Sequence, residues 1–299
     1  MTDYHVFSLS SPPSPTSSPP TVVDHGVALS VEDVPWAEKQ LWAPDAAEKN
    51  GKYYLFFPAR DREGVFRIGV AVSEKPEGPF KAQEKWIEGS YSIDPAVFVD
   101  DDEEKSAYVY FGGIWGGQLQ CWTQSDGKWI YDKESYSAME PSGDNVPALG
   151  PRVAKLRENM LEFDGEGVKE VEILDGKGEK IRANDHKKRF FEASWVHKHQ
   201  GLYYFSYSTG DCHEIVYATG KSPFGPFTYR GVLLKEVLGW TTHHSIVEWE
   251  GKWWLFYHDA SLSGGKNHLR SVKVREIVYG GEGGEELFLK EKQDEEDGN

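Results

Sequence analysis

The chain has 299 residues, of which 14% are aromatic, and a formal net charge of -16. This length allows one large domain with a substantial core. The negative charge argues against nucleic acid and anionic membranes as partners, and no apolar run reaches the length of a membrane span. The only cysteines, Cys121 and Cys212, are too few for a disulfide framework or a zinc site.

Three parts follow one another along the chain. Residues 1–21 include a Ser/Pro-rich tract over 8–20 that cannot pack a core, so we expect this part to be partly disordered. Short β-rich runs separated by Gly, Asp and Pro turns predict an all-β domain over 22–289. Residues 290–299 form an acidic tail that we expect to be disordered. The first residues lack the basic and apolar segments of a secretion signal, so the sequence as written predicts a cytoplasmic protein.

A repeated unit gives the all-β domain its predicted architecture. Four times, a segment with an acid or a histidine precedes a strand rich in aromatic residues. The pairs are Asp45 before 52–57, Asp94 before 107–111, Glu192 before 202–207 and His243 before 252–257. Two of these units also end in a Gly-Pro-Phe corner, at 78–80 and at 225–227.

The length of the unit indicates a β-propeller. Asp45 and Asp94 are 49 residues apart and Glu192 and His243 are 51 apart, close to the length of a four-stranded blade. The gap of 98 residues between Asp94 and Glu192 holds either two blades or one blade with a long insertion. The Gly- and charge-rich composition of 125–190 favours the insertion. A β-sandwich also has many short strands, but it does not predict repeated lettering at this period.

The propeller geometry predicts a chemical site on its axis. Equivalent residues of successive blades point to one centre, so Asp94, Glu192 and His243 should converge there. Two carboxyl groups facing one pocket acquire different pKa values, and one of them stays protonated. Such a pair suits the hydrolysis of glycosidic bonds. A single Asp before a strand is more often a turn residue, and only the recurrence across units favours the catalytic interpretation.

Four motifs together resemble glycoside hydrolase family 43, over about residues 24–279. They are WAPD at 42–45, IDPAVFVDD at 93–101, FEASW at 191–195 and THHSIVE at 242–248. The resemblance implies a five-bladed β-propeller with inverting β-xylosidase, α-L-arabinofuranosidase or arabinanase activity. Its substrates would be xylose- or arabinose-containing plant polysaccharides or oligosaccharides, and no cofactor would be required. Members of the family are often secreted, which leaves the compartment open.

The resemblance also implies roles for individual residues. Glu192 would be the general acid, and Asp94 would orient it and raise its pKa. His243 would lie beside an axial structural calcium ion; alternatively, it or its neighbour hydrogen-bonds within the core. Arg270 would contact sugar hydroxyls, although a lone Arg at a strand start is equally consistent with a surface ion pair.

Two further residues are expected to bind the substrate. Trp42 would offer its ring to the apolar face of a sugar. Asp45, in the same motif, would shape the pocket.

The sequence departs from the family at its start. The family places its general base on the first blade, and counting back one blade of about 50 residues from Asp45 lands before Met1. Residues 3–8 and 23–26 resemble only the late part and the exit of that blade. We therefore expect an incomplete first blade without the base, lost in evolution or through an imperfect gene model. Neither Asp3, Asp24 nor Asp45 is assigned as a substitute.

Two consequences follow from this expectation. The hydrolase would be impaired as written, and strand edges of the open blade would reduce solubility. The alternative functions are a non-catalytic carbohydrate-binding propeller and a propeller that serves only protein interaction. The retained acid pair argues against the last of these, because a scaffold has no use for two like charges at close range.

Overall fold

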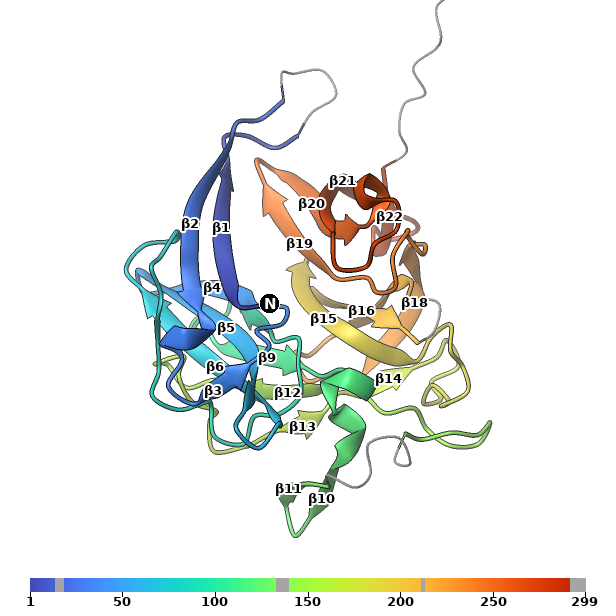
Figure 1. The fold of residues 1–299 in the computed structure, drawn as a ribbon. Helices are drawn as coiled ribbons and strands as arrows, with labels where there is room; N and C mark the ends of the chain where they lie inside the picture. Colours follow the sequence, from blue (N-terminus) through green and yellow to red (C-terminus); the bar gives the residue numbers. More distant parts are fainter. Residues whose placement is uncertain (14–18, 133–139, 211–212, 291–299) are drawn as a thin grey trace, which may run out of the picture.

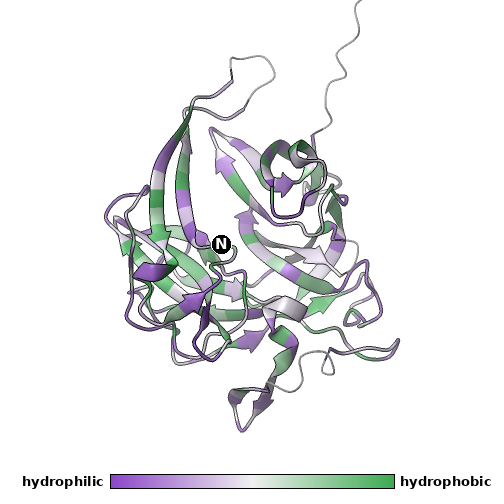
Figure 2. Ribbon diagram, viewed as in Figure 1, coloured by the Kyte–Doolittle hydropathy of each residue, from purple (hydrophilic) through white to green (hydrophobic). Residues whose placement is uncertain are grey.

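The computed structural model describes residues 1–13, 19–132, 140–210 and 213–290. These residues form five sheets around a common centre and one separate hairpin, so the fold is all-β and propeller-like, as predicted (Figure 1). Hydrophobic residues lie mainly within the strands, and the connecting loops are mostly hydrophilic (Figure 2). Among the described residues, no helix is long and apolar enough to cross a membrane.

The five sheets follow the chain in order. The first pairs β1 (Asp3–Leu9) with β2 (Val22–Ser30). The second has the order β3 (Ala37–Lys39), β5 (Lys52–Asp61), β6 (Phe66–Ser73) and β7 (Lys81–Ala82), with β4 (Asp45–Lys49) also paired to β5. The third runs β8 (Ala96–Val99), β9 (Ala107–Phe111), β12 (Arg152–Lys155) and β13 (Lys169–Glu170).

The last two sheets follow in the same order. The fourth runs β15 (Phe190–His199), β16 (Leu202–Thr209), β17 (Ile215–Gly220) and β18 (Phe227–Leu234), with β14 (Ile173–Leu174) added in parallel to β18. The fifth runs β19 (His244–Trp249), β20 (Lys252–Asp259), β21 (Ser271–Gly280) and β22 (Glu286–Leu289).

The predicted aromatic strands are the second strands of four sheets, namely β5, β9, β16 and β20. Aromatic side chains favour the extended, pleated backbone, and here they fill the space between sheets. Phe56, Phe111, Phe205 and Leu255 have no solvent exposure. The Gly-Pro-Phe corners bury Phe80 and Phe227 where the outermost strand begins. The repeat read from the sequence is therefore the repeat of the sheets.

The four leading residues of the repeat lie at or near the start of an innermost strand. Asp45 begins β4, Asp94 lies two residues before β8, Glu192 lies near the start of β15, and His243 directly precedes β19. These strands contact one another in turn, β4 with β8, β8 with β15, and β15 with β19. The ring therefore gathers residues that are far apart in sequence.

In its described residues, the region over 125–190 adds no blade of its own. It begins within the hairpin of β10 (Trp122–Ser125) and β11 (Lys128–Tyr131), which projects from the ring in Figure 1. Its other strands join the third and fourth sheets. The segment 154–161, for which the sequence allowed a helix or a strand with a turn, contains the end of β12 and a turn.

The N-terminal hairpin joins two of the expected parts. Leu9 pairs with Val22, so the predicted boundary between residues 21 and 22 falls inside one sheet. Of the Ser/Pro tract, residues 14–18 lie outside the described residues, as do residues 291–299 of the predicted tail. The incomplete first blade stays a prediction. Tyr4 of β1 is buried, and its hydroxyl donates to the carbonyl of Trp42.

Candidate active site

Asp94 and Glu192 meet between the third and fourth sheets. Asp94 is buried, and its Oδ2 accepts a hydrogen bond of 3.0 Å from the backbone N–H of Ala193, the residue after Glu192. The pairing of β15 with β16 shifts register on both sides of Glu192, and Ala193 has a φ of 60°. Such bulges change the direction of side chains along a strand. The predicted acid pair is thus brought together, with one carboxyl held against the backbone beside the other.

The environment of the pair keeps a proton on it. Burial, and then the charge of Asp94, raise the pKa of Glu192 well above its usual range, against the opposing effect of the Arg270 guanidinium. Burial raises the pKa of Asp94 to about 7, although the Ala193 hydrogen bond and Arg270 both act to lower it. Glu192 therefore holds its proton more tightly than Asp94. This is the state that a general acid needs near neutral pH.

A glycine packs directly against the pair. A Cβ on Gly113 would lie 2.6 Å from Cδ1 of Ile93 and 3.3 Å from Cβ of Glu192. The loop is fixed there by a hydrogen bond of 3.0 Å from the N–H of Ile114 to the carbonyl of Phe191. The absence of a side chain at Gly113 allows the segments that carry Asp94 and Glu192 to approach each other.

Arg270 lies exposed at the edge of the pair, held by neighbours of its own. Its Nε donates to the carbonyl of Asn267 at 2.8 Å, and one Nη donates to Oγ1 of Thr241 at 3.0 Å. The other Nη lies 3.4 Å from Nε2 of His258. Its charge lowers the pKa of both carboxyl groups, which places it close enough to act on them. Contact with sugar hydroxyls stays a prediction for this side chain.

His243 also faces the pair, with Nδ1 at 3.8 Å from Oδ2 of Asp94. Burial and the charge of Arg270 lower the pKa of His243 to about 4, so the ring is neutral near pH 7. Its neighbour His244 is the residue that hydrogen-bonds within the core, with Nε2 at 2.6 Å from Oγ of Ser206.

The calcium ion expected beside His243 would need oxygen ligands around it. Calcium prefers six to eight oxygen ligands, whereas the described residues contain no group of three or more His, Cys, Asp or Glu that could hold a metal ion. The expected axial calcium therefore stays a prediction, and the roles assigned below use only side chains of the chain.

Trp42 and Asp45 lie on the neighbouring sheet. Trp42 is half-buried and packs on Phe66 at 4.6 Å between ring centroids. Both carboxyl oxygens of Asp45 accept backbone N–H groups, from Ala46 at 2.8 Å and from Val97 at 2.7 Å. Asp45 thus ties β4 to β8, and burial raises its pKa to about 7. The predicted sugar contacts of both residues stay predictions.

An aromatic cluster next to Glu192 was not predicted from the sequence. It consists of Trp115, Phe191, His213 and Trp240, whose rings contact one another. Three of these residues come from loops without periodicity. The signal that could have found them is a tryptophan followed directly by a Gly-Gly pair, at 115–117, and one directly before the Thr-Thr-His-His segment.

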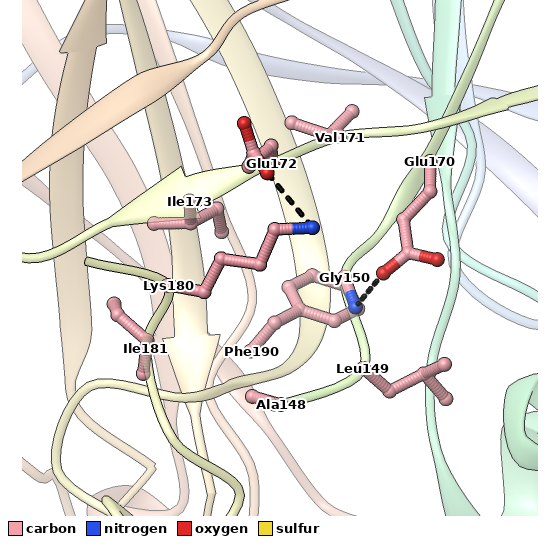
Figure 3. A pocket seen from close by; sticks show the side chains of 10 residues that line it. All are labelled: Ala148, Leu149, Gly150, Glu170, Val171, Glu172, Ile173, Lys180, Ile181 and Phe190. Carbon is pink, nitrogen blue, oxygen red and sulfur yellow. Dashed lines mark hydrogen bonds and ion pairs between the residues drawn. The ribbon is translucent and has the colours of Figure 1, made fainter. Parts of the chain in front are cut away.

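A separate cavity of about 360 Å³ lies in the inserted region (Figure 3). Its polar groups are already paired. Lys180 lies 2.8 Å from Glu172, and Glu170 accepts a hydrogen bond of 3.1 Å from the N–H of Gly150. None of the predicted site residues lines it. Its wall includes Phe190, two residues before Glu192, so the cavity is close in sequence to the acid but does not contain it.

A propeller-like ring that presents a protonated carboxyl beside a second carboxyl defines a class of protein, the glycoside hydrolases. Comparison with known proteins narrows this class. The model of the family described as "Glycosyl hydrolases family 43" matches residues 24–283. The chain belongs to glycosyl hydrolase family 43.

Close relatives have related names. "Xylosidase/arabinosidase 43A" of Humicola insolens is 63% identical over 284 residues, covering 95% of this chain and 84% of that protein. A "Beta-xylosidase" of Xylanibacter ruminicola is 51% identical, covering 95% and 84%. A crystal structure of a β-xylosidase/α-arabinofuranosidase from a compost metagenome, with xylotriose in a calcium-free form, has a TM-score of 0.86 and 58% identity. It covers 94% of this chain and 81% of that one.

Proposed function

We propose that this chain hydrolyses the glycosidic bond of a xylose or arabinose residue in oligosaccharides derived from plant xylan. The observation that carries the proposal is the hydrogen bond from the Ala193 N–H to Asp94. It fixes a second carboxyl next to Glu192, whose own pKa is raised. The names of the similar proteins, xylosidases and arabinosidases, support the choice of sugar.

In the proposed reaction Glu192 gives its proton to the oxygen of the bond that breaks. The departing sugar then leaves as a neutral alcohol, which lowers the barrier for a poor leaving group. Asp94 keeps the proton on Glu192 until that step, and Arg270 limits the charge that the pair accumulates. Water adds to the opposite face of the sugar with inversion, a step that needs a carboxylate base there. The expected loss of this base stays a prediction, and the roles of Glu192 and Asp94 do not depend on it.

The test compares substrates that do and do not need an acid. Purified protein and its Glu192→Gln variant are assayed on xylobiose and on 2,4-dinitrophenyl β-xyloside, and on the matching arabinosides. Loss of a general acid should cost about 10²- to 10⁴-fold on the disaccharide. It should cost far less on the dinitrophenyl glycoside, whose leaving group departs without a proton.

The control is Glu170→Gln, which removes a carboxylate from the separate cavity. It should leave the ratio of the two rates unchanged. Equal losses on both substrates in Glu192→Gln would contradict the acid role. Calorimetric binding of xylose or arabinose without any turnover would favour the alternative, a non-catalytic carbohydrate-binding propeller.

A further inference from the structure

Two tryptophans lie exposed beside the acid pair. Trp115 is 36% exposed and Trp240 is 48% exposed. Their ring centroids are 6.1 Å apart and their planes differ by 25°, so the two rings form one nearly continuous surface. Large aromatic side chains contribute strongly to binding when a ligand covers them. Rings left this open by the fold are available to a ligand.

Both tryptophans are fixed relative to Glu192 through Phe191. Trp115 meets the edge of Phe191 at 5.2 Å and 89°, and Trp240 meets it at 6.1 Å and 81°. Phe191 is 1% exposed and directly precedes Glu192 in the chain. His213, also buried, contacts both Phe191 and Trp240. The exposed surface and the proton donor therefore rest on the same strand.

The backbone of Trp115 is held in an unfavourable conformation. Its φ of 55° lies in the left-handed region, which is rare for a bulky residue. The side chain of Gln120 accepts from the N–H of Trp115 at 2.9 Å and donates to its carbonyl at 3.2 Å. The indole Nε1 donates to Glu140 at 2.5 Å. These hydrogen bonds fix the ring in its exposed position before any ligand arrives.

The same turn separates this surface from Trp42. A Cβ on Gly116 would lie 3.2 Å from Cη2 of Trp42, so Trp42 packs against the residue that follows Trp115. The chain thus has one aromatic surface at Trp42 and a second at Trp115 and Trp240, with Glu192 next to the second.

We propose that Trp115 and Trp240 bind the sugar ring on the leaving side of the bond, the ring whose oxygen Glu192 protonates. This inference rests on the proposed function. It places the other sugar ring, whose anomeric carbon is attacked by water, on the side of Trp42. The apolar face of a pyranose or furanose ring would stack on the two indoles. The surface would then select substrates by the chain beyond the cleaved bond and leave the choice of terminal sugar to other residues.

The test measures binding of one sugar ring against two. Dissociation constants for xylose and xylobiose, and for arabinose and arabinobiose, are determined by calorimetry in the Glu192→Gln background, which suppresses turnover of the disaccharides, with and without Trp240→Ala. Loss of one stacking surface should weaken the disaccharide about tenfold, corresponding to about 1.4 kcal/mol, while the monosaccharide constant changes less than about twofold. Trp240→Phe keeps an aromatic face and should restore most of the loss.

Phe288→Ala is the matched control. Phe288 is 44% exposed on β22. The variant therefore loses an aromatic ring that is about as exposed as that of Trp240 but lies outside the cluster. The ratio of the disaccharide to the monosaccharide dissociation constant decides. If it is unchanged in Trp240→Ala, and the variant unfolds at the temperature of its Glu192→Gln parent, this inference alone is overturned. A Glu192→Gln chain with both tryptophans intact that binds none of the four sugars would overturn the proposed function as well. If Trp240→Ala fails to fold, the ratio measured for Trp240→Leu decides, because leucine fills part of the space of the indole but offers no aromatic face.

Discussion

Replacing Asp94 by Asn should make Glu192 a stronger acid. The charge of Asp94 is one of the causes that raise the pKa of Glu192, and Asn removes that charge. The amide oxygen of Asn can still accept the hydrogen bond from Ala193 N–H that Asp94 accepts now. The substitution therefore changes the electrostatics of the pair while keeping its geometry.

The size of the effect follows from Coulomb's law. Two like charges about 4–6 Å apart, at an effective dielectric constant of about 20, repel by about 3–4 kcal/mol. Glu192 is only half-buried, so solvent screens part of such a repulsion. In Asp94→Asn the pKa of Glu192 falls, and the alkaline limb of the pH–rate profile moves to lower pH.

Two measurements check the shift. One is the pH dependence of kcat/KM, and the other is a ¹³C NMR titration of the Glu192 carboxyl, which does not require turnover. Asp100→Asn is the control, because Asp100 directly follows the same strand, β8, but pairs with Lys198. An alkaline limb or a Glu192 titration that stays in place in Asp94→Asn, or moves to higher pH, would refute the reasoning.

Two further predictions concern packing and buried charge. Gly113→Ala places a methyl group 2.6 Å from Ile93 and should lower the free energy of unfolding in urea by about 1–3 kcal/mol and reduce activity. Gly165→Ala, which has nothing within 4 Å, should do neither. The folded pKa of Asp45 is about 7, above its unfolded value of about 3.9, so the folded state binds more protons between these values. Stability from this group is present below about pH 4 and is lost as the pH rises towards 7. Asp45→Asn should therefore flatten the fall in unfolding free energy over that range, and an unchanged slope would contradict the assignment.

The repeat in the sequence predicted much of the fold because each unit carries the same physical requirement. A leading polar residue and an aromatic strand recur in four units, and a Gly-Pro-Phe corner in two of them, because the sheets pack against their neighbours in the same way. The positions of Asp94 and Glu192 followed from this rule. The addition of β14 to the fourth sheet did not, because a strand of two residues has no periodicity to detect.

The details of the site lie beyond such rules. The φ of 60° at Ala193 and the register shifts around Glu192 arise from packing between sheets, which a local pattern does not encode. The role of Asp45 in joining two strands could not be predicted from the sequence for the same reason. Its motif indicated a pocket residue, whereas both of its oxygens bond the backbone of Ala46 and Val97, a contact that only the ring brings about.

The strands β8 and β15 are joined near both of their ends. Near one end Asp94 meets Ala193, and at the other Lys198 meets Asp100 at 2.8 Å. Two contacts therefore fix Asp94 relative to the strand of Glu192, and neither contact involves the loops of Trp115 and Trp240. Under the proposal above, substitutions in those loops would change the polymer that is recognised and leave these two contacts in place.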